Sequence, residues 1–212
     1  HTRWATHGQV TIDNAHPHKN CTDTLAVAHN GIVENHCLLR DELLANGHSF
    51  SSETDSEVIP HLIEENMASG MSLIPACRLA FKRLEGSQAI LVLSLDAPTT
   101  LIATHIGNAG GIALATRHKE ALLASDVSAL MSFSNRVLTL NSGELLIADP
   151  GESTILDLNG ETIDRVPDAD KERMIVDTGQ REDEVVITDK EINDVIEQKK
   201  AEGKNDDANV VE

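Results

Sequence analysis

The chain opens with the run His1-Thr2-Arg3-Trp4-Ala5-Thr6-His7-Gly8. Three more dense clusters follow within the first 57 residues: Asn14-Ala15-His16-Pro17-His18, then His29-Asn30-Gly31 with Glu34-Asn35-His36, and last Glu53-Thr54-Asp55-Ser56-Glu57. Charged, amide and imidazole side chains grouped with glycine are typical of binding and catalytic loops carried on a rigid scaffold. These four clusters are therefore the part of the sequence from which fold and function are best inferred.

Helices are expected between and after these clusters. A short apolar run from 24 to 28 predicts a strand that ends in a tight turn at Asn30-Gly31. Asn35 can cap a first helix that stops at Gly47, and Thr54-x-x-Glu57 is a capping-box pattern that opens a second. Their expected buried stripes are Leu38, Leu39, Leu43 and Leu44, and Val58, Ile59, Leu62 and Ile63. Pro60, placed beyond the first turn, should cost the second helix a backbone bond or a bend. A third helix is expected from about 72 to 84.

Strands are expected from Gln88 onward. The short apolar or β-rich runs span 89–95, 101–104, 111–115, 121–124, 136–140, 144–148, 153–158 and 162–166, the last two as a hairpin around Asn159-Gly160. Helices followed by many strands indicate an α+β layered domain rather than alternating βαβ units.

Composition and charge bound the class of protein. One domain is expected over residues 1–166, followed at 167–212 by an acidic linker or tail, partly disordered, with one possible helix from 189 to 200. The formal charge is −18, and the last 46 residues hold 15 acidic and 7 basic side chains, so the acidity extends over the whole chain. Such a surface argues against nucleic acid and anionic membranes as partners.

The cysteines and histidines are the residues that could form disulfides or bind metals. Cys21, Cys37 and Cys77 are an odd number without paired spacing, and no apolar stretch approaches the roughly 18 residues of a membrane helix, which favours a cytoplasmic protein with reduced thiols. His16-x-His18 together with Cys21 could seed a zinc site, but the spacing matches no regular zinc finger. No metal is expected.

The four clusters, in this order, resemble the glutaminase domain of class II glutamine amidotransferases, and most of all the isomerising glutamine–fructose-6-phosphate aminotransferases. The similarity is dense over 1–65 and thinner afterwards: Ala124-Ser125-Asp126 matches, whereas a glycine-rich run at 107–111 stands where the family has Ser-Pro-Leu, and Lys190-Glu191-Ile192 echoes a segment before the family's sugar-isomerase domain. The resemblance implies the four-layer αββα sandwich of N-terminal-nucleophile hydrolases, incomplete here at its N-terminus, and no cofactor.

Glutamine offers a carboxylate, an ammonium group and a side-chain amide to a selective site. Arg3 suits the carboxylate because its planar fork binds bidentately, and Asp55 suits the ammonium group. Taken singly, each could be a surface ion pair contributing ~0–1 kcal/mol. The resemblance also implies that Trp4, Thr6, His7 and Gly8 line the glutamine pocket, although Trp4 could equally be a core residue.

Asn30 and Gly31 suit an oxyanion hole, whose donors each stabilise the developing charge by roughly 3–4 kcal/mol. The alternative is structural, because Asn-Gly is the commonest type I′ hairpin turn. The resemblance favours the catalytic interpretation.

The family's nucleophile is an N-terminal cysteine whose own α-amino group acts as the base. His1 does not match it and the three cysteines lie in other contexts, so we expect the chain as given to be inactive and marginally stable, and its native form to begin upstream. In that form we expect a sugar-phosphate isomerase domain that accepts fructose 6-phosphate, in a homo-oligomer. The alternatives are another class II amidotransferase of the amidophosphoribosyltransferase type, and a non-catalytic glutamine-binding pseudoenzyme.

Overall fold

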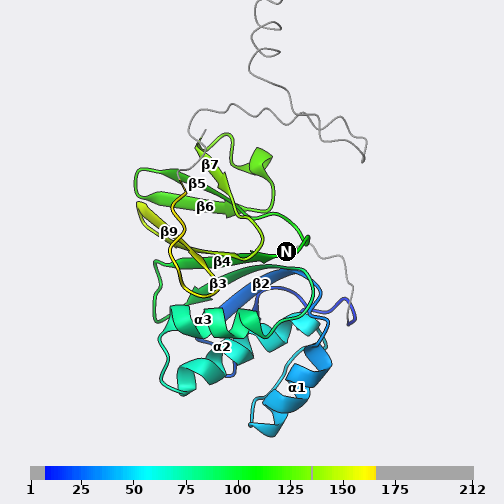
Figure 1. Ribbon diagram of the computed structural model, residues 1–212. Coiled ribbons are helices and arrows are strands. Elements are labelled where there is room, and N and C mark those ends of the chain that lie inside the picture. Colours follow the sequence, from blue (N-terminus) through cyan, green and yellow to red (C-terminus); the bar gives the residue numbers. More distant parts are fainter. Residues whose placement is uncertain (1–7, 135, 166–212) are drawn as a thin grey trace, which may run out of the picture. The chain divides into compact units, whose positions relative to one another are not determined.

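The computed structural model describes residues 8–134 and 136–165 as three stacked layers (Figure 1). Helices cover one face of a large sheet, and a smaller sheet packs against its other face. The helical segments are α1 (His36–Ala45), η1 (Asp55–Glu57), α2 (Val58–Ala68), α3 (Leu73–Lys82) and η2 (Val127–Ala129). The strands are β1 (His18–Lys19), β2 (Leu25–Gly31), β3 (Gln88–Ser94), β4 (Leu101–Ile106), β5 (Ala113–Arg117), β6 (Glu120–Ala124), β7 (Val137–Thr139), β8 (Glu144–Asp149) and β9 (Glu152–Asp157).

Both sheets are antiparallel. The larger has the order β1-β2-β3-β4-β8-β9 and the smaller the order β6-β5-β7. Two face-to-face antiparallel sheets with helices over one of them agree with the αββα architecture that the sequence analysis expects, of which the described residues contribute the α, β and β layers. Among these residues, no helix combines the length and the apolar character needed to cross a bilayer.

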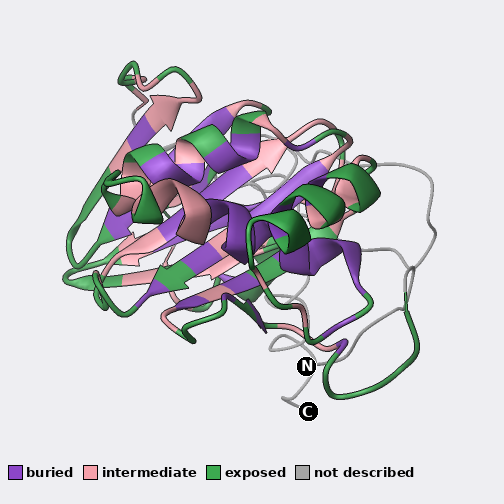
Figure 2. Cartoon of the chain, turned by 90° about the horizontal axis from the view of Figure 1, so that it is seen from below, coloured by how far each residue is buried: buried purple, intermediate pink, exposed green. Residues whose placement is uncertain are grey.

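Two apolar cores hold the layers together. The first lies between the helices and the large sheet and is made of branched aliphatic side chains such as Val27, Ile59 and Leu145, each fully buried. The second lies between the sheets and includes smaller residues such as Ala103 and Ala148. Figure 2 shows buried residues, in purple, on both the helices and the strands. Small side chains between the sheets allow a close approach of the two layers.

The expected turn at Asn30-Gly31 is wrong. Strand β2 continues through both residues, and they pair with Ala89 and Gln88 of β3. The Asn-Gly pair is a local turn signal, but pairing with a strand nearly sixty positions later satisfies the backbone instead, which is a tertiary effect.

The first helix is confirmed, with two corrections. Leu39 and Leu43 are buried, whereas Leu38 and Leu44 are 70% and 49% exposed, because an i, i+4 pair is enough for a helix that packs along one narrow edge. Asn35 makes no capping bond; its Nδ2 donates to Arg83 O over 2.8 Å and its Oδ1 accepts from Glu85 N over 3.2 Å. The side chain ties this helix to the end of α3 instead.

The second helix also forms without the expected capping box. Glu57 does not reach back to Thr54 but accepts hydrogen bonds from Ser51 and Ser52. Pro60 is the third residue of α2, inside the first turn, where the proline's missing N–H removes no intrahelical bond. The expected cost of Pro60 is therefore wrong.

The other elements follow the expected order. The third helix and the runs between 89 and 158 correspond to α3 and β3–β9, whereas β1 and the β8–β9 hairpin were not anticipated. The expected final strand at 162–166 is reduced to one bridge between Thr162 and Leu156. The acidic segment 167–212, with its expected helix, lies outside the described residues.

Candidate functional site

A cleft of about 260 Å³ opens between the two sheets at the end of β2. Asn30 is exposed on this side, together with Ala28 on the same face of the strand. The remaining lining comes from β2, β3 and β6 and from the segments before β1, before β5 and after β6: His16, His29, Ala89, Ile90, Leu91, Gly111, Ile112, Leu123, Ala124 and Ser125. The cleft is mostly apolar, so a carboxamide at its edge is well placed to orient a small polar ligand.

Gly31 adopts a conformation that only glycine tolerates. Its φ is +143°, and a Cβ there would lie 2.2 Å from Ser87 O and 3.0 Å from His29 Nε2. A Cβ on Gly110 would similarly lie 2.5 Å from Asn30 Nδ2. The glycine-rich loop at 107–111, which departs from the family pattern, thus approaches the Asn30 amide closely.

His29 fixes this end of β2 from the opposite, helix-facing side. Its Nε2 lies 2.5 Å from Gln88 Oε1, and its Nδ1 lies 2.8 Å from Ser56 Oγ. Gln88 Nε2 donates to Ile32 O and Glu85 O, so Gln88 Oε1 is an acceptor and His29 Nε2 carries a proton. Burial lowers the pKa of His29, against opposing contributions from Asp55 and Gln88. The imidazole is therefore neutral near pH 7, and its Nδ1 accepts from Ser56.

Asp55 is the first residue of η1 and is 2% exposed. Its Oδ2 accepts from Val33 N over 2.8 Å, which joins the segment after β2 to the start of the second helical region. Asp55 does not line the cleft. The structure therefore brings Asp55 and Asn30 to the same end of β2, but with Asn30 turned to the cleft and Asp55 packed on the helix side.

Only the last residue of the first cluster, Gly8, can be placed. A Cβ on Gly8 would lie 2.7 Å from Asn14 Nδ2 and 3.2 Å from Glu53 Cβ. Asn14 Nδ2 donates to Gln9 O over 2.9 Å, and Asn14 Oδ1 accepts from Glu53 N over 2.9 Å. The first, second and fourth clusters therefore meet. The sites expected at Arg3, Trp4, Thr6 and His7 lie outside the described residues.

Comparison with known proteins identifies the family. The family described as "Glutamine amidotransferase domain" matches residues 1–132. The chain belongs to the glutamine amidotransferase domain family.

Curated relatives of the amidotransferase domain include proteins named "Glutamine--fructose-6-phosphate aminotransferase [isomerizing]". The protein from Methanothermobacter thermautotrophicus is 42% identical over 165 residues, which cover 78% of this chain and 28% of the relative. The protein from Sulfolobus acidocaldarius is 40% identical, over 86% of this chain and 30% of the relative. The chain thus spans less than a third of the length of these relatives.

Solved structures support the fold of the amidotransferase domain. Glutamine phosphoribosylpyrophosphate amidotransferase from B. subtilis, complexed with ADP and GMP, aligns with a TM-score of 0.63 at 24% identity. The alignment covers 74% of this chain and 34% of that one. At this identity the likeness concerns the fold alone.

Several residues around Asn30 and His29 were not anticipated. Ser56 and Gln88 hold the His29 ring, Gly110 approaches Asn30, and Ser125 lines the cleft. Ser56 and Ser125 lie in sequence motifs described above, but neither motif predicts which residue or cleft the serine contacts. The sequence signal that could have indicated Gln88 is its position as a polar residue at the start of an apolar strand. In the structure Gln88 is completely buried.

The three cysteines of the amidotransferase domain lie away from the cleft lining. Burial raises the pKa of the Cys77 thiol to about 12, which makes it a poor nucleophile. Cys37 is exposed on α1. Cys21 does not approach His16 or His18, as the zinc alternative required, but contacts His48 and His61. The Cys21 thiol belongs to a separate polar cluster.

Proposed function

We propose that this chain is the glutamine-hydrolysing part of an isomerising glutamine–fructose-6-phosphate aminotransferase. The observation that carries the proposal is identity near 40% over three quarters or more of the chain with relatives of that name. The geometry at the end of β2 supports it, because an exposed carboxamide lines the cleft and is followed directly by a position that requires glycine.

Asn30 and Gly31 would stabilise the oxyanion when the glutamine amide is attacked. The Asn30 amide and the Gly31 N–H act as donors, each worth roughly 3–4 kcal/mol if they are preorganised. Preorganisation is the role of His29, whose neutral ring locks β2 to Gln88 and Ser56. Because that ring is held on both nitrogens, it positions the strand and takes no part in proton transfer.

The rest of glutamine would be held by charges of opposite sign. Arg3 binds the α-carboxylate, and Asp55, oriented by Val33 N, binds the ammonium group. Trp4, Thr6, His7 and Gly8 complete the pocket. Neutralising both charged ends selects the free amino acid over a glutamine residue within a peptide.

The nucleophile would be an N-terminal cysteine outside the printed sequence, since the described thiols do not line the cleft. Ammonia would pass to a sugar-phosphate isomerase domain that binds fructose 6-phosphate, in a homo-oligomeric and cytoplasmic enzyme. In this reaction the thiol attacks the amide with the α-amino group as base, ammonia leaves, and water hydrolyses the thioester. None of these steps requires a cofactor.

The test measures products with the longest native form of the protein. Glutamate release from glutamine, with glucosamine 6-phosphate formed from fructose 6-phosphate, is the expected result. Product formation with 5-phosphoribosyl pyrophosphate instead would favour the amidophosphoribosyltransferase type. That alternative is supported only by the similarity of fold. Glutamine binding without glutamate release would identify a pseudoenzyme.

A further inference from the structure

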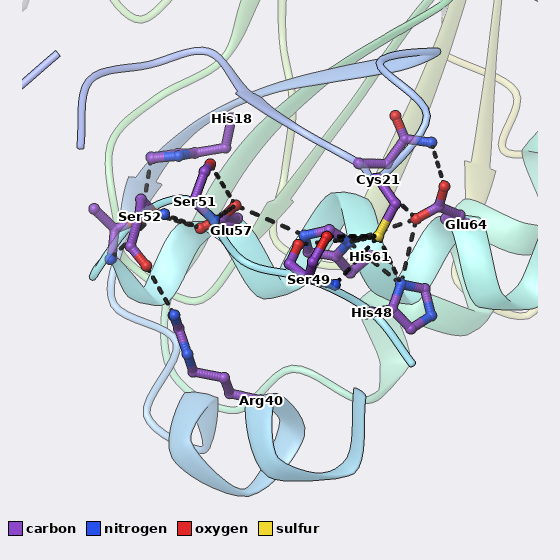
Figure 3. A network of polar contacts seen from close by, with 12 residues as sticks. His18, Cys21, Arg40, His48, Ser49, Ser51, Ser52, Glu57, His61 and Glu64 are labelled. Atoms are coloured by element: carbon purple, nitrogen blue, oxygen red, sulfur yellow. Dashed lines mark hydrogen bonds and ion pairs between the residues drawn. The ribbon is translucent and has the colours of Figure 1, made fainter. Parts of the chain in front are cut away.

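Four side chains on the helix side of the molecule point their ligand atoms at one another (Figure 3). Cys21 follows β1, His48 lies between α1 and η1, and His61 and Glu64 are one turn apart on α2. The Cys21 Sγ, one ring nitrogen of each histidine and a carboxylate oxygen all lie within 4.8 Å of one another. Among the described residues this is the one group of metal-type ligands of this kind.

Five of the six ligand-to-ligand distances match the edges of a tetrahedron around zinc, and the sixth, from Cys21 Sγ to the Glu64 carboxylate, lies within 4.8 Å. Bonds of about 2.05 Å to nitrogen and about 2.3 Å to sulfur place two nitrogens about 3.3 Å apart, and a nitrogen and a sulfur about 3.6 Å apart. His48 Nδ1 lies 3.3 Å from His61 Nδ1 and 3.3 Å from Glu64 Oε2. Cys21 Sγ lies 3.6 Å from His48 Nδ1 and 3.5 Å from His61 Nδ1, and the edge from His61 Nδ1 to Glu64 Oε2 is 3.5 Å.

An outer shell orients His61 toward this point. His61 is 1% exposed, and its Nε2 lies 3.7 Å from Glu57 Oε1. Glu57 is itself held in place by hydrogen bonds from Ser51 N and Ser52 N. The Glu57 carboxylate thus lies behind the His61 ring, on the side of Nε2, while Nδ1 faces the cluster, as carboxylates lie behind zinc-bound histidines.

The other two ligands are supported in the same way. Glu64 Oε1 accepts from Asn20 Nδ2 over 3.0 Å and from Thr22 Oγ1 over 3.1 Å, which turns Oε2 toward the cluster. Ser49 N donates to Cys21 Sγ over 3.4 Å. Both ends of the cluster are therefore held in place by neighbouring segments.

Hydrogen bonding alone does not account for this geometry. Five contacts of 3.3–3.6 Å join the four groups. The thiol and the two Nδ1 atoms can supply three hydrogens at most, fewer than the five contacts. A cation at the centre satisfies every lone pair at once.

We propose that Cys21, His48, His61 and Glu64 bind one zinc ion. Mixed nitrogen, sulfur and oxygen ligands in tetrahedral geometry are typical of zinc. Four protein ligands close the coordination sphere, so the ion is structural. The ion joins three separate segments of the chain. One of its ligands, His61, contacts Glu57, which belongs to the same short helix η1 as Asp55. This revises the expectation of no metal.

The experiment is metal analysis of the purified protein without a polyhistidine tag, followed by titration of the metal-free form with Co²⁺. We expect one equivalent of zinc per chain, and a cobalt spectrum with intense tetrahedral d–d bands and a thiolate-to-cobalt charge-transfer band. Cys21→Ser should abolish the charge-transfer band and the bound zinc. Cys37→Ser, which changes an exposed thiol outside the cluster, is the matched control and should change neither.

Glu57→Gln tests the outer shell and should weaken cobalt binding by about 10- to 100-fold without removing the charge-transfer band. Absence of zinc together with a cobalt spectrum that lacks this band would overturn the proposal. So would zinc that survives Cys21→Ser. If that variant does not fold, the cobalt spectrum of the unmodified protein decides, and none of these measurements depends on glutamine turnover.

Discussion

The two faces of strand β2 carry opposite kinds of residue. On the helix side Leu25, Val27 and His29 are buried, and the one polar member is bonded at both ring nitrogens. On the other side Ala28 and Asn30 are exposed at the cleft. One strand thus separates the residues that position the site from the carboxamide that we propose stabilises the oxyanion.

This difference explains how the Asn30 side chain can be held in a fixed position and still be accessible to a ligand. A buried hydrogen-bonded histidine rigidifies the strand, because breaking it would leave unpaired polar groups away from water. The carboxamide of Asn30, the next residue, is therefore fixed in position by the rigid strand. Because this side chain is exposed, it contributes little to the free energy of unfolding. Substitutions on the two faces should therefore separate activity from folding.

The largest effect is expected for Asn30→Ala. Loss of one oxyanion donor should lower kcat for glutamine hydrolysis by about 10²–10³-fold, while the unfolding free energy stays within about 0.5 kcal/mol because the side chain is exposed. Steady-state kinetics and urea unfolding of the native enzyme measure the two quantities. Asn159→Ala, an exposed amide far along the chain, is the control. Unchanged kcat in Asn30→Ala would remove Asn30 from the mechanism.

Gly31→Ala should act on folding as well as activity. The added Cβ would meet Ser87 O at 2.2 Å in a backbone conformation that alanine resists, so we expect a loss of about 3 kcal/mol or more. Gly70→Ala is the matched control, since Gly70 also has positive φ but has open space around it. Equal losses in urea unfolding for the two variants would show that the contact with Ser87 is unimportant.

Neighbouring residues of β2 give a direct test of its two faces. Val27→Thr places a hydroxyl in the fully buried core and should cost about 1–3 kcal/mol. Ala28→Ser adds a hydroxyl at the exposed cleft face and should change the unfolding free energy by less than about 0.5 kcal/mol. Similar thermal and urea stabilities for both variants would contradict the assignment of faces.

His29 should give the free energy of unfolding a dependence on pH. Its folded pKa lies below the unfolded value of 6.5, so between these values the unfolded chain binds a proton that the folded chain does not. Stability should be unaffected above 6.5 and should fall as the pH decreases below it, by at most about 1.4 kcal/mol per pH unit. His29→Gln should reduce this slope, whereas His118→Gln, at an exposed position, should not. A slope that is identical in all three proteins would refute the buried neutral imidazole.

Glu57 contributes in a separate and more acidic range. Its pKa is lowered from 4.5 to about 2, so its stabilisation is present above 4.5 and is lost as the pH falls toward 2. Between pH 4.5 and pH 2, the free energy of unfolding measured in urea should fall with decreasing pH in the unmodified protein. It should fall less steeply in Glu57→Gln, which lacks the titrating carboxylate.

The sequence by itself determined the family, the order of helices and strands, and the identities of Asn30, Gly31 and Asp55 as candidates. These are carried by local patterns: apolar periodicity, glycine positions and short motifs are all written within a few consecutive residues. The sequence could not determine whether Asn30-Gly31 turns or stays extended, because the deciding partner is strand β3, and His29 and Gln88 meet across 59 positions.

Tertiary structure alone decided which face of β2 reaches the cleft, how the His29 ring is held, and that Cys21, His48, His61 and Glu64 converge. The sequence offered His16, His18 and Cys21 as ligands because they are close in the chain. Folding instead placed Cys21 against a helix forty residues away. Side-chain convergence depends on packing of segments that are distant in sequence, and no local pattern encodes it.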